Sequence, residues 1–147
     1  MKQTLLLIAF SLFITVGAWA QSPVGQWKTI DDETGKERSI VEIYEKNGKL
    51  YGKIVKLLNR GADEDPDPVC DKCPNKDDRK DQKVIGMEIL REMAKDGDEW
   101  EDGTILDPEK GKVYDCKLWI DPANKDILKL RGYVAFFFRT QDWHRVK

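Results

Sequence analysis

The sequence predicts an all-β domain with mainly antiparallel strands, and three observations support this prediction. Apolar residues recur at every second position in short runs, as in Val41 and Ile43, and this period of two is typical of strands with one buried face. Asn47-Gly48 separates two such runs and is a strong signal for a β-hairpin. Further turn-forming dipeptides follow at 102–103, 107–108 and 121–122. About eight short strands with regular turns are typical of a sandwich or a barrel.

The first 20 residues have the features of a secretory leader. Lys2 supplies a positive charge, residues 5–16 form an apolar run, and Ala18-Trp19-Ala20 is a small-x-small cleavage site. We therefore expect cleavage after Ala20, a single mature domain over residues 21–147, and a periplasmic or secreted protein. The apolar run is too short for a spanning helix, so we do not expect the protein to span a membrane.

The charge balance excludes some partners. Removal of Lys2 changes the formal net charge from −2 to −3. A binder of nucleic acid or of a membrane surface usually carries a basic patch, and here acids and lysines alternate along most of the chain. We expect no nucleic-acid partner.

The expected elements follow the alternation and the turn signals. A short helix over about 87–95 fits the spacing of Met87, Leu90 and Met93, although a strand over 84–90 fits nearly as well. Gly132 indicates a bulge or a close backbone approach in its strand. The expected strands cover residues 25–30, 38–46, 49–58, 98–101, 104–106, 112–120, 127–134 and 141–146.

A long irregular segment over about 59–83 interrupts the pattern. It is rich in proline and acidic residues, and it contains Cys70 and Cys73. Adjacent cysteines in an exported protein favour a disulfide, so we pair these two. Cys116 falls on the apolar face of a strand and is expected to be a buried free thiol.

The two ends of the mature chain favour a barrel over a sandwich. Gly25-Gln26-Trp27 opens the first strand and Arg145 lies in the last, which is similar to the signature of the calycins, the lipocalin-type up-and-down barrels. An arginine on an indole face gains cation–π energy, on the order of 1 kcal/mol. Trp27 and Arg145 are therefore expected to close one barrel end.

The chain also resembles a secreted bacterial family catalogued as domain of unknown function 2147. The resemblance covers nearly the whole mature chain and implies a small exported β-barrel domain, with no established reaction. The motifs that carry it are Gly25-x-Trp27-Lys28-Thr29, residues 39–43, Tyr51-Gly52-Lys53-Ile54, Cys70-x-x-Cys73, the run from Gly103 to Tyr114, Leu130-Arg131-Gly132-Tyr133 and Trp143-x-Arg145.

Residues with catalytic or metal-binding chemistry are few. His144 is the only histidine, and Asp142 is its neighbour on the same strand face, but a surface position is favoured over a catalytic pair. Cys70, Cys73, Cys116 and His144 have the ligand types of a zinc site. The acidic run at 63–67 lacks the glycine and glutamate of an EF-hand. We expect no catalytic residues, metal or cofactor, and keep a metal-binding or thiol-redox protein as an alternative.

The candidate ligand-binding residues lie on strand faces of mixed polarity. They are Glu42, Tyr44, Tyr51, Arg131 and Tyr133. Aromatic walls with a few polar groups are typical of small-molecule pockets, so we expect these side chains to face the barrel lumen. A bulge at Gly132 would turn Arg131 inward, where Glu42 could pair with it.

The sequence supports two candidate functions. The first is a non-enzymatic protein that binds a small apolar or amphiphilic molecule in the barrel. The second is an envelope protein-interaction module that uses the Cys70–Cys73 loop, with an unknown protein partner.

Overall fold

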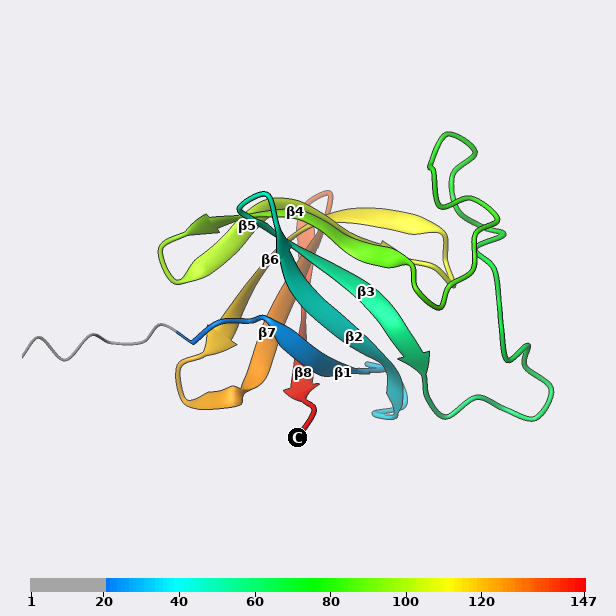
Figure 1. Cartoon of the computed structure of the whole chain (residues 1–147), viewed down its shortest axis with the longest axis horizontal. Coiled ribbons are helices and arrows are strands. Elements are labelled where there is room, and N and C mark those ends of the chain that lie inside the picture. The colour runs from blue at the N-terminus through cyan, green and yellow to red at the C-terminus, as the bar shows by residue number, and fades with distance from the viewer. Residues whose placement is uncertain (1–20) are drawn as a thin grey trace, which may run out of the picture.

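The structure, a computed structural model, describes residues 21–147. The predicted leader therefore lies outside the described residues. Eight antiparallel strands form a closed up-and-down barrel in which each strand pairs with the next and β8 pairs with β1 (Figure 1). The strands are β1 (Gly25–Ile30), β2 (Glu37–Lys46), β3 (Lys49–Leu57), β4 (Glu88–Asp96), β5 (Glu99–Asp107), β6 (Lys112–Asp121), β7 (Asn124–Val134) and β8 (Phe137–Arg145).

Inward-facing side chains fill the barrel. Trp27 of β1 and Trp143 of β8 are almost completely buried, as are Leu90, Leu118 and Leu128 from β4, β6 and β7. They belong to one hydrophobic core to which all eight strands contribute. The two cavities described below lie at one end of the barrel and on its outer wall.

The expected short helix over 87–95 is wrong, because this segment is strand β4, and no helix occurs among residues 21–147. Leu90 and Met93 both point into the core, although a regular strand would place Leu90 and residue 92 on one face. Glu92 has a φ of 61°, and the β3–β4 register shifts on passing from Met93 to Leu90. The extra residue of this bulge produces a spacing of three that imitates a helix.

The Asp102-Gly103 signal marks a second bulge and not a turn. Both residues lie inside β5, and the β4–β5 turn falls at residues 97–98. Asp102 has a φ of 60°, and the β5–β6 register shifts between Trp100 and Gly103. A Cβ at Gly103 would overlap Met93 Sδ and the Arg91 carbonyl oxygen. Only glycine lets the two kinked strands approach this closely.

The long segment between β3 and β4 is docked on the barrel. Cys70 and Cys73 form a disulfide and are both buried. A Cβ at Gly111, in the β5–β6 turn, would overlap the Lys72 backbone, so this turn and the disulfide loop are in direct contact. Arg79, only 5% exposed, binds Asp77 through two hydrogen bonds and donates to the Glu88 carbonyl oxygen at 3.0 Å. The segment therefore packs against the barrel end that Figure 1 shows on the right.

Candidate functional site

Trp27 and Arg145 lie in contact where the chain enters the barrel. The guanidinium carbon of Arg145 is 4.1 Å from the centre of the Trp27 ring system, and the two residues are register partners in the β1–β8 pair. The indole Nε1 donates to the carbonyl oxygen of Pro23 at 2.8 Å. Arg145 also donates to the Lys125 carbonyl oxygen at 3.4 Å. These contacts fix the N-terminal segment against the start of β7.

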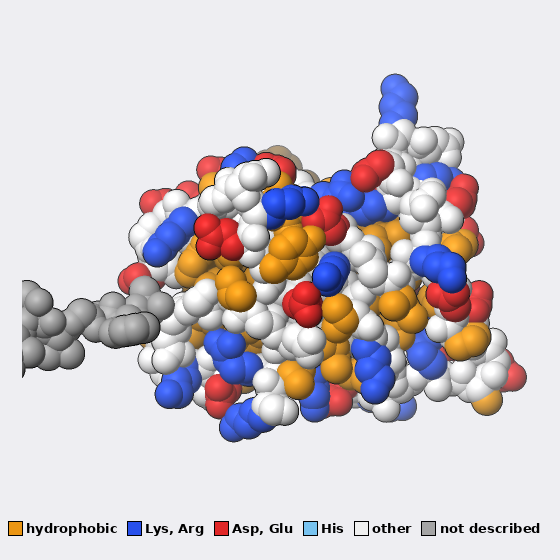
Figure 2. All heavy atoms as spheres, in the orientation of Figure 1, with side chains coloured by type: hydrophobic (Ala, Val, Ile, Leu, Met, Phe, Trp, Pro, Cys, Tyr) orange, Lys and Arg blue, Asp and Glu red, His pale blue; other side chains and the backbone are white. Residues whose placement is uncertain are grey.

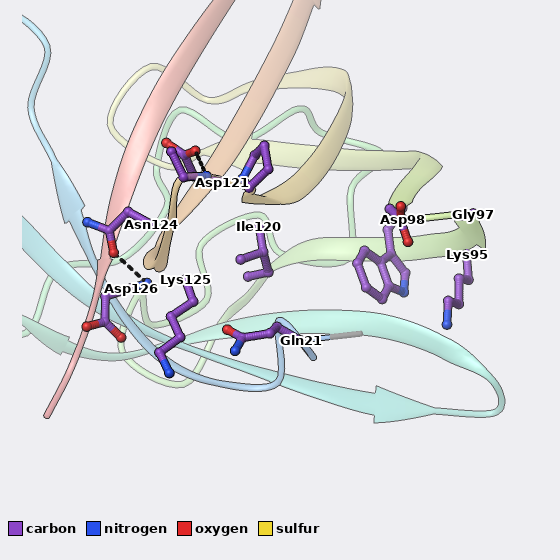
Figure 3. Close-up of a pocket in the computed structure, with 12 residues that line it drawn as sticks. Gln21, Lys95, Gly97, Asp98, Ile120, Asp121, Asn124, Lys125 and Asp126 are labelled. Atoms are coloured by element: carbon purple, nitrogen blue, oxygen red, sulfur yellow. Dashed lines mark hydrogen bonds between the residues drawn. The ribbon is translucent and has the colours of Figure 1, made fainter. Parts of the chain in front are cut away.

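A cavity of about 650 Å³ opens beside this contact. It lies between the β4–β5 and β6–β7 hairpins, with Gln21 along one side (Figure 3). Trp100 and Ile120 contribute apolar surface, and Figure 3 shows Ile120 between the two hairpins. We call this hollow the mouth cavity. Its other lining residues are Lys95, Gly97, Asp98, Asp121, Pro122, Ala123, Asn124, Lys125 and Asp126.

The charges around the mouth cavity fall into two groups. Asp121 is 3.6 Å from Lys129, and Asp126 pairs with both Arg145 and Lys147. Among residues 21–147, by contrast, Asp98 and Lys125 form no ion pair. They lie on the two different hairpins that bound the cavity. Lys95 also forms no ion pair among the described residues and lies 5.7 Å from the centre of the Trp100 ring, so the rim presents one carboxylate and two ammonium groups without an ionic partner.

Glu42, Tyr44 and Tyr51 lie on the outer wall, which corrects the expected lumenal orientation. Ser39, Val41 and Ile43 are the buried residues of β2, so Glu42 and Tyr44 point outward. Tyr51 is the register partner of Tyr44, and their rings stack with centroids 6.2 Å apart. The mixed face was assigned inward because it carries aromatic rings, whereas aliphatic residues hold the inner face.

Ion pairs and hydrogen bonds satisfy this outer cluster. The Tyr44 hydroxyl donates to Glu88 and the Tyr51 hydroxyl to Glu92. Burial, followed by the Glu88 hydrogen bond, raises the pKa of Tyr44 to about 12. Glu42 is 3.3 Å from Lys53 and does not meet Arg131. Figure 2 shows cationic and anionic side chains interspersed over the face that β2 and β3 present.

Arg131 also stays on the outer wall, because the expected bulge at Gly132 is absent. The pairing of β7 with β6 and with β8 runs through Gly132 without a register shift. Arg131 therefore keeps the facing opposite to Leu130 and lies over the rings of Trp119 and Phe138, at 5.2 and 4.3 Å. Tyr133 lines a separate outer hollow of about 450 Å³ beside Glu101, Asp102 and Lys117.

The cysteines and His144 do not form a common metal site. The disulfide occupies Cys70 and Cys73, and the free thiol of Cys116 is buried 3.6 Å from Met93 Sδ. Burial is the main reason why the pKa of Cys116 rises to about 12. Residues 21–147 contain no cluster of three or more potential metal ligands. Asp142 binds Lys129 at 2.8 Å, so it is not free to orient His144.

Sequence reasoning missed the mouth cavity. The turn signal at Asp102-Gly103 predicts an isolated short run around Trp100, whereas in the structure Trp100 lies near the start of β5. A usable signal was present: Trp100 and Ile120 are apolar residues at strand ends next to turns, where a barrel interior opens to solvent.

The fold and its mouth cavity define a lipocalin-like β-barrel protein. The structure is similar to protein HP1028 from the human pathogen Helicobacter pylori, which is described as belonging to the lipocalin family. The TM-score is 0.70 at 18% identity, with 86% of this chain and 84% of that chain covered. At this identity the likeness concerns the fold alone.

The sequence identifies the family. Residues 25–145 match the family described as uncharacterized protein conserved in bacteria, domain of unknown function 2147. The chain belongs to this family. No curated protein matches it in sequence. Within residues 21–147, no helix has the length and apolarity needed to cross a membrane.

Proposed function

We propose that this protein binds a small amphiphilic molecule at the mouth cavity and does not transform it. The observation that carries the proposal is the cavity itself. Its volume of about 650 Å³ is within the range of roughly 300–1,000 Å³ typical of small-molecule sites. A lipocalin-like barrel is compatible with this role.

The apolar part of the ligand would lie against Trp100 and Ile120. These two side chains are the large apolar residues of the lining, whereas most of the other lining residues are polar or charged, and this combination favours an amphiphile. The head group would meet Lys125 and Asp98, whose charges have no partner among residues 21–147. A negatively charged head group would pair with Lys125, while Asp98 would accept a hydrogen bond from a hydroxyl or an amine.

The proposal includes no reaction. The remaining rim carboxylates, Asp121 and Asp126, are held by cations of β7 and of the C-terminal segment. These ion pairs hold the rim carboxylates against neighbouring strands and keep the hairpins in place. This arrangement suits the orientation of a ligand.

We also propose that the protein is exported and acts in the periplasm or outside the cell. The leader-like sequence over 1–20 supports this location, and a disulfide is stable in an oxidising compartment. The intact mass of protein recovered from its own host tests the proposal. A chain that starts at Gln21 supports it, and an uncleaved chain in the cytoplasm contradicts it.

Native mass spectrometry of protein purified from its own host tests the binding function. We expect a small-molecule adduct on the unmodified protein. The variant Ile120→Trp fills the mouth cavity and should lose the adduct. Ile85→Trp, at an exposed position of the long loop, is the matched control and should retain it. An adduct that persists in Ile120→Trp would place the ligand elsewhere and contradict the proposal.

A further inference from the structure

Among residues 21–147, the most exposed large apolar side chains lie at the tip of the β7–β8 hairpin. Phe136 is 100% exposed, Phe137 77% and Phe138 61%, and Val134 is 52% exposed. We call these four residues the aromatic tip. Ala135 and Phe136 form the two-residue turn, since Val134 and Phe137 are the last register partners.

The residues at this turn are not the ones that the turn geometry requires. Ala135 has a φ of 49°, a conformation for which hairpins usually use Asn, Asp or Gly. A run of three phenylalanines also exposes apolar surface that folding does not use. Contiguous exposed apolar patches of this kind mark interaction sites.

The size and shape of the tip argue against a dimer held by this contact alone. A phenylalanine offers about 150–250 Å² of surface, so the tip offers roughly 400–500 Å² of aromatic surface per chain. Two tips in contact would bury roughly 1,000 Å² in total, which is below the roughly 1,200 Å² of stable specific interfaces. A convex tip instead suits a fluid acceptor into which single side chains can insert.

Cations border the tip. Arg131 lies 4.3 Å from the Phe138 ring and donates to Thr140 Oγ1 at 2.9 Å. Within the described residues Arg131 forms no ion pair, whereas Arg139 pairs with Asp32 at 3.4 Å. Asp115, the register partner of Tyr133, lies on the same wall, and Glu101 and Asp102 line the hollow beside Tyr133. An arginine next to an inserted aromatic ring can extend to a lipid phosphate.

We propose that the aromatic tip inserts into the interface of a lipid bilayer and holds the protein at a membrane surface. Phe on an apolar face, together with Lys or Arg on the polar side, is typical of segments that insert into the membrane interface. The net negative charge of the chain disfavours electrostatic adsorption, but insertion of aromatic rings depends on apolar area. The contact is therefore local to the tip.

This anchoring would set the position of the mouth cavity. Strand β7 begins at Asn124, which lines the cavity, and ends at Val134 in the tip. Its 11 residues span about 30 Å at 3.3 Å per residue, allowing for tilt. Figure 1 shows the β7–β8 turn at the upper edge, away from the β4–β5 and β6–β7 turns. The cavity would thus remain open to the aqueous phase. The anchoring does not depend on any ligand.

Cosedimentation with lipid vesicles tests the proposal. The protein is first checked by intact mass, because an uncleaved apolar leader would itself bind lipid. One set of vesicles contains phosphatidylcholine alone, and the other contains equal parts of phosphatidylcholine and phosphatidylglycerol.

We expect the unmodified protein to bind both sets of vesicles and to bind those with phosphatidylglycerol more strongly. Phe136→Ser combined with Phe137→Ser should weaken this binding about tenfold or more, and Arg131→Gln should reduce the preference for phosphatidylglycerol.

The control variant removes exposed apolar residues elsewhere. Val69 and Ile85 are 44% and 39% exposed in the long loop, and Val69→Ser with Ile85→Ser should bind vesicles as the unmodified protein does. Failure of the unmodified protein to bind either vesicle would overturn the proposal. An equal loss of vesicle binding in the two double variants would also overturn the proposal. A concentration-dependent dimer that only the Phe136→Ser, Phe137→Ser variant abolishes would assign the tip to a second copy instead.

Discussion

The guanidinium of Arg145 lies 4.1 Å from the Trp27 ring centre and joins the last strand of the barrel to the first. The same side chain reaches the backbone of Ser22 and of Lys125, at 3.5 and 3.4 Å. One residue thus connects the strand that closes the barrel, the N-terminal segment and the hairpin that bounds the mouth cavity. The same side chain therefore helps to close the barrel and holds the hairpin that bounds the mouth cavity.

Replacement of Arg145 should destabilise the barrel. Arg145→Ala removes a half-buried cation–π contact and leaves the Trp27 face open, so we expect a loss of about 1–2 kcal/mol in the free energy of unfolding and a red shift of tryptophan emission. Urea unfolding followed by fluorescence measures both. Arg139→Ala, which removes an arginine that is 62% exposed, should change the free energy by less than about 0.5 kcal/mol. Equal effects of the two substitutions would show that the contact is not a stabilising one.

Gly103 and Gly132 offer a matched pair of glycine substitutions within strands. A Cβ at Gly103 would overlap Met93 and the backbone of Arg91, whereas a Cβ at Gly132 would come no closer than 3.9 Å to any atom. Gly103→Ala should therefore cost about 2–4 kcal/mol of unfolding free energy. Gly132→Ala should be neutral or slightly stabilising. Thermal denaturation of both variants checks this, and a tolerated Gly103→Ala would mean that the double bulge is not tightly packed.

Some features of the fold could be predicted from the sequence and others could not. The β2–β3 hairpin at Asn47-Gly48 and the disulfide followed from local signals, because turn chemistry and cysteine spacing are properties of neighbouring residues. The bulges at Glu92 and Asp102 do not depend on neighbouring residues alone. They are fixed by close contact between β4 and β5, which no single segment reveals. As a result one strand was assigned to a helix and one bulge to a turn.

The orientation of the candidate site was also beyond local reasoning. Strand alternation showed that Leu128 and Leu130 share a face opposite to Arg131, which the structure bears out. The inward placement of Arg131 required a bulge at Gly132 that pairing with β6 and β8 does not contain. The mouth cavity depends on how two hairpins and the N-terminal segment meet, which is a property of the closed barrel.

Cys116 should make the barrel sensitive to alkaline pH. Its pKa is raised from 9.0 to about 12, chiefly by burial, so the unfolded chain loses this proton at lower pH than the folded one. The contribution to stability is complete below about pH 9 and disappears as pH rises toward 12. Urea unfolding at about pH 7 and about pH 10 should show a smaller decline for Cys116→Ala than for the unmodified protein. Tyr44, whose pKa is also raised to about 12, accounts for part of the remaining decline. Identical declines in both proteins would contradict a protonated buried thiol.

Removal of the disulfide should loosen the long loop and leave the barrel folded. The Cys70–Cys73 bridge closes a loop with a sequence separation of 3, for which chain entropy gives only about 2 kcal/mol of stabilisation. Limited proteolysis of the Cys70→Ser, Cys73→Ser variant should show faster cleavage within residues 59–83, with an unchanged far-ultraviolet spectrum. Global unfolding would show that the docked loop supports the whole barrel. Peptide mapping under non-reducing conditions should find Cys116 reduced.

Amide chemical-shift mapping with dodecanoate, a simple anionic amphiphile, tests the proposed binding site most directly. The account predicts saturable shifts that cluster at residues 97–100 and 120–126, the two hairpins around the mouth cavity. These shifts should disappear in Ile120→Trp and persist in Ile85→Trp. Shifts that cluster instead on the outer wall of β2 and β3, or that survive in Ile120→Trp, would contradict a ligand site at the mouth of the barrel.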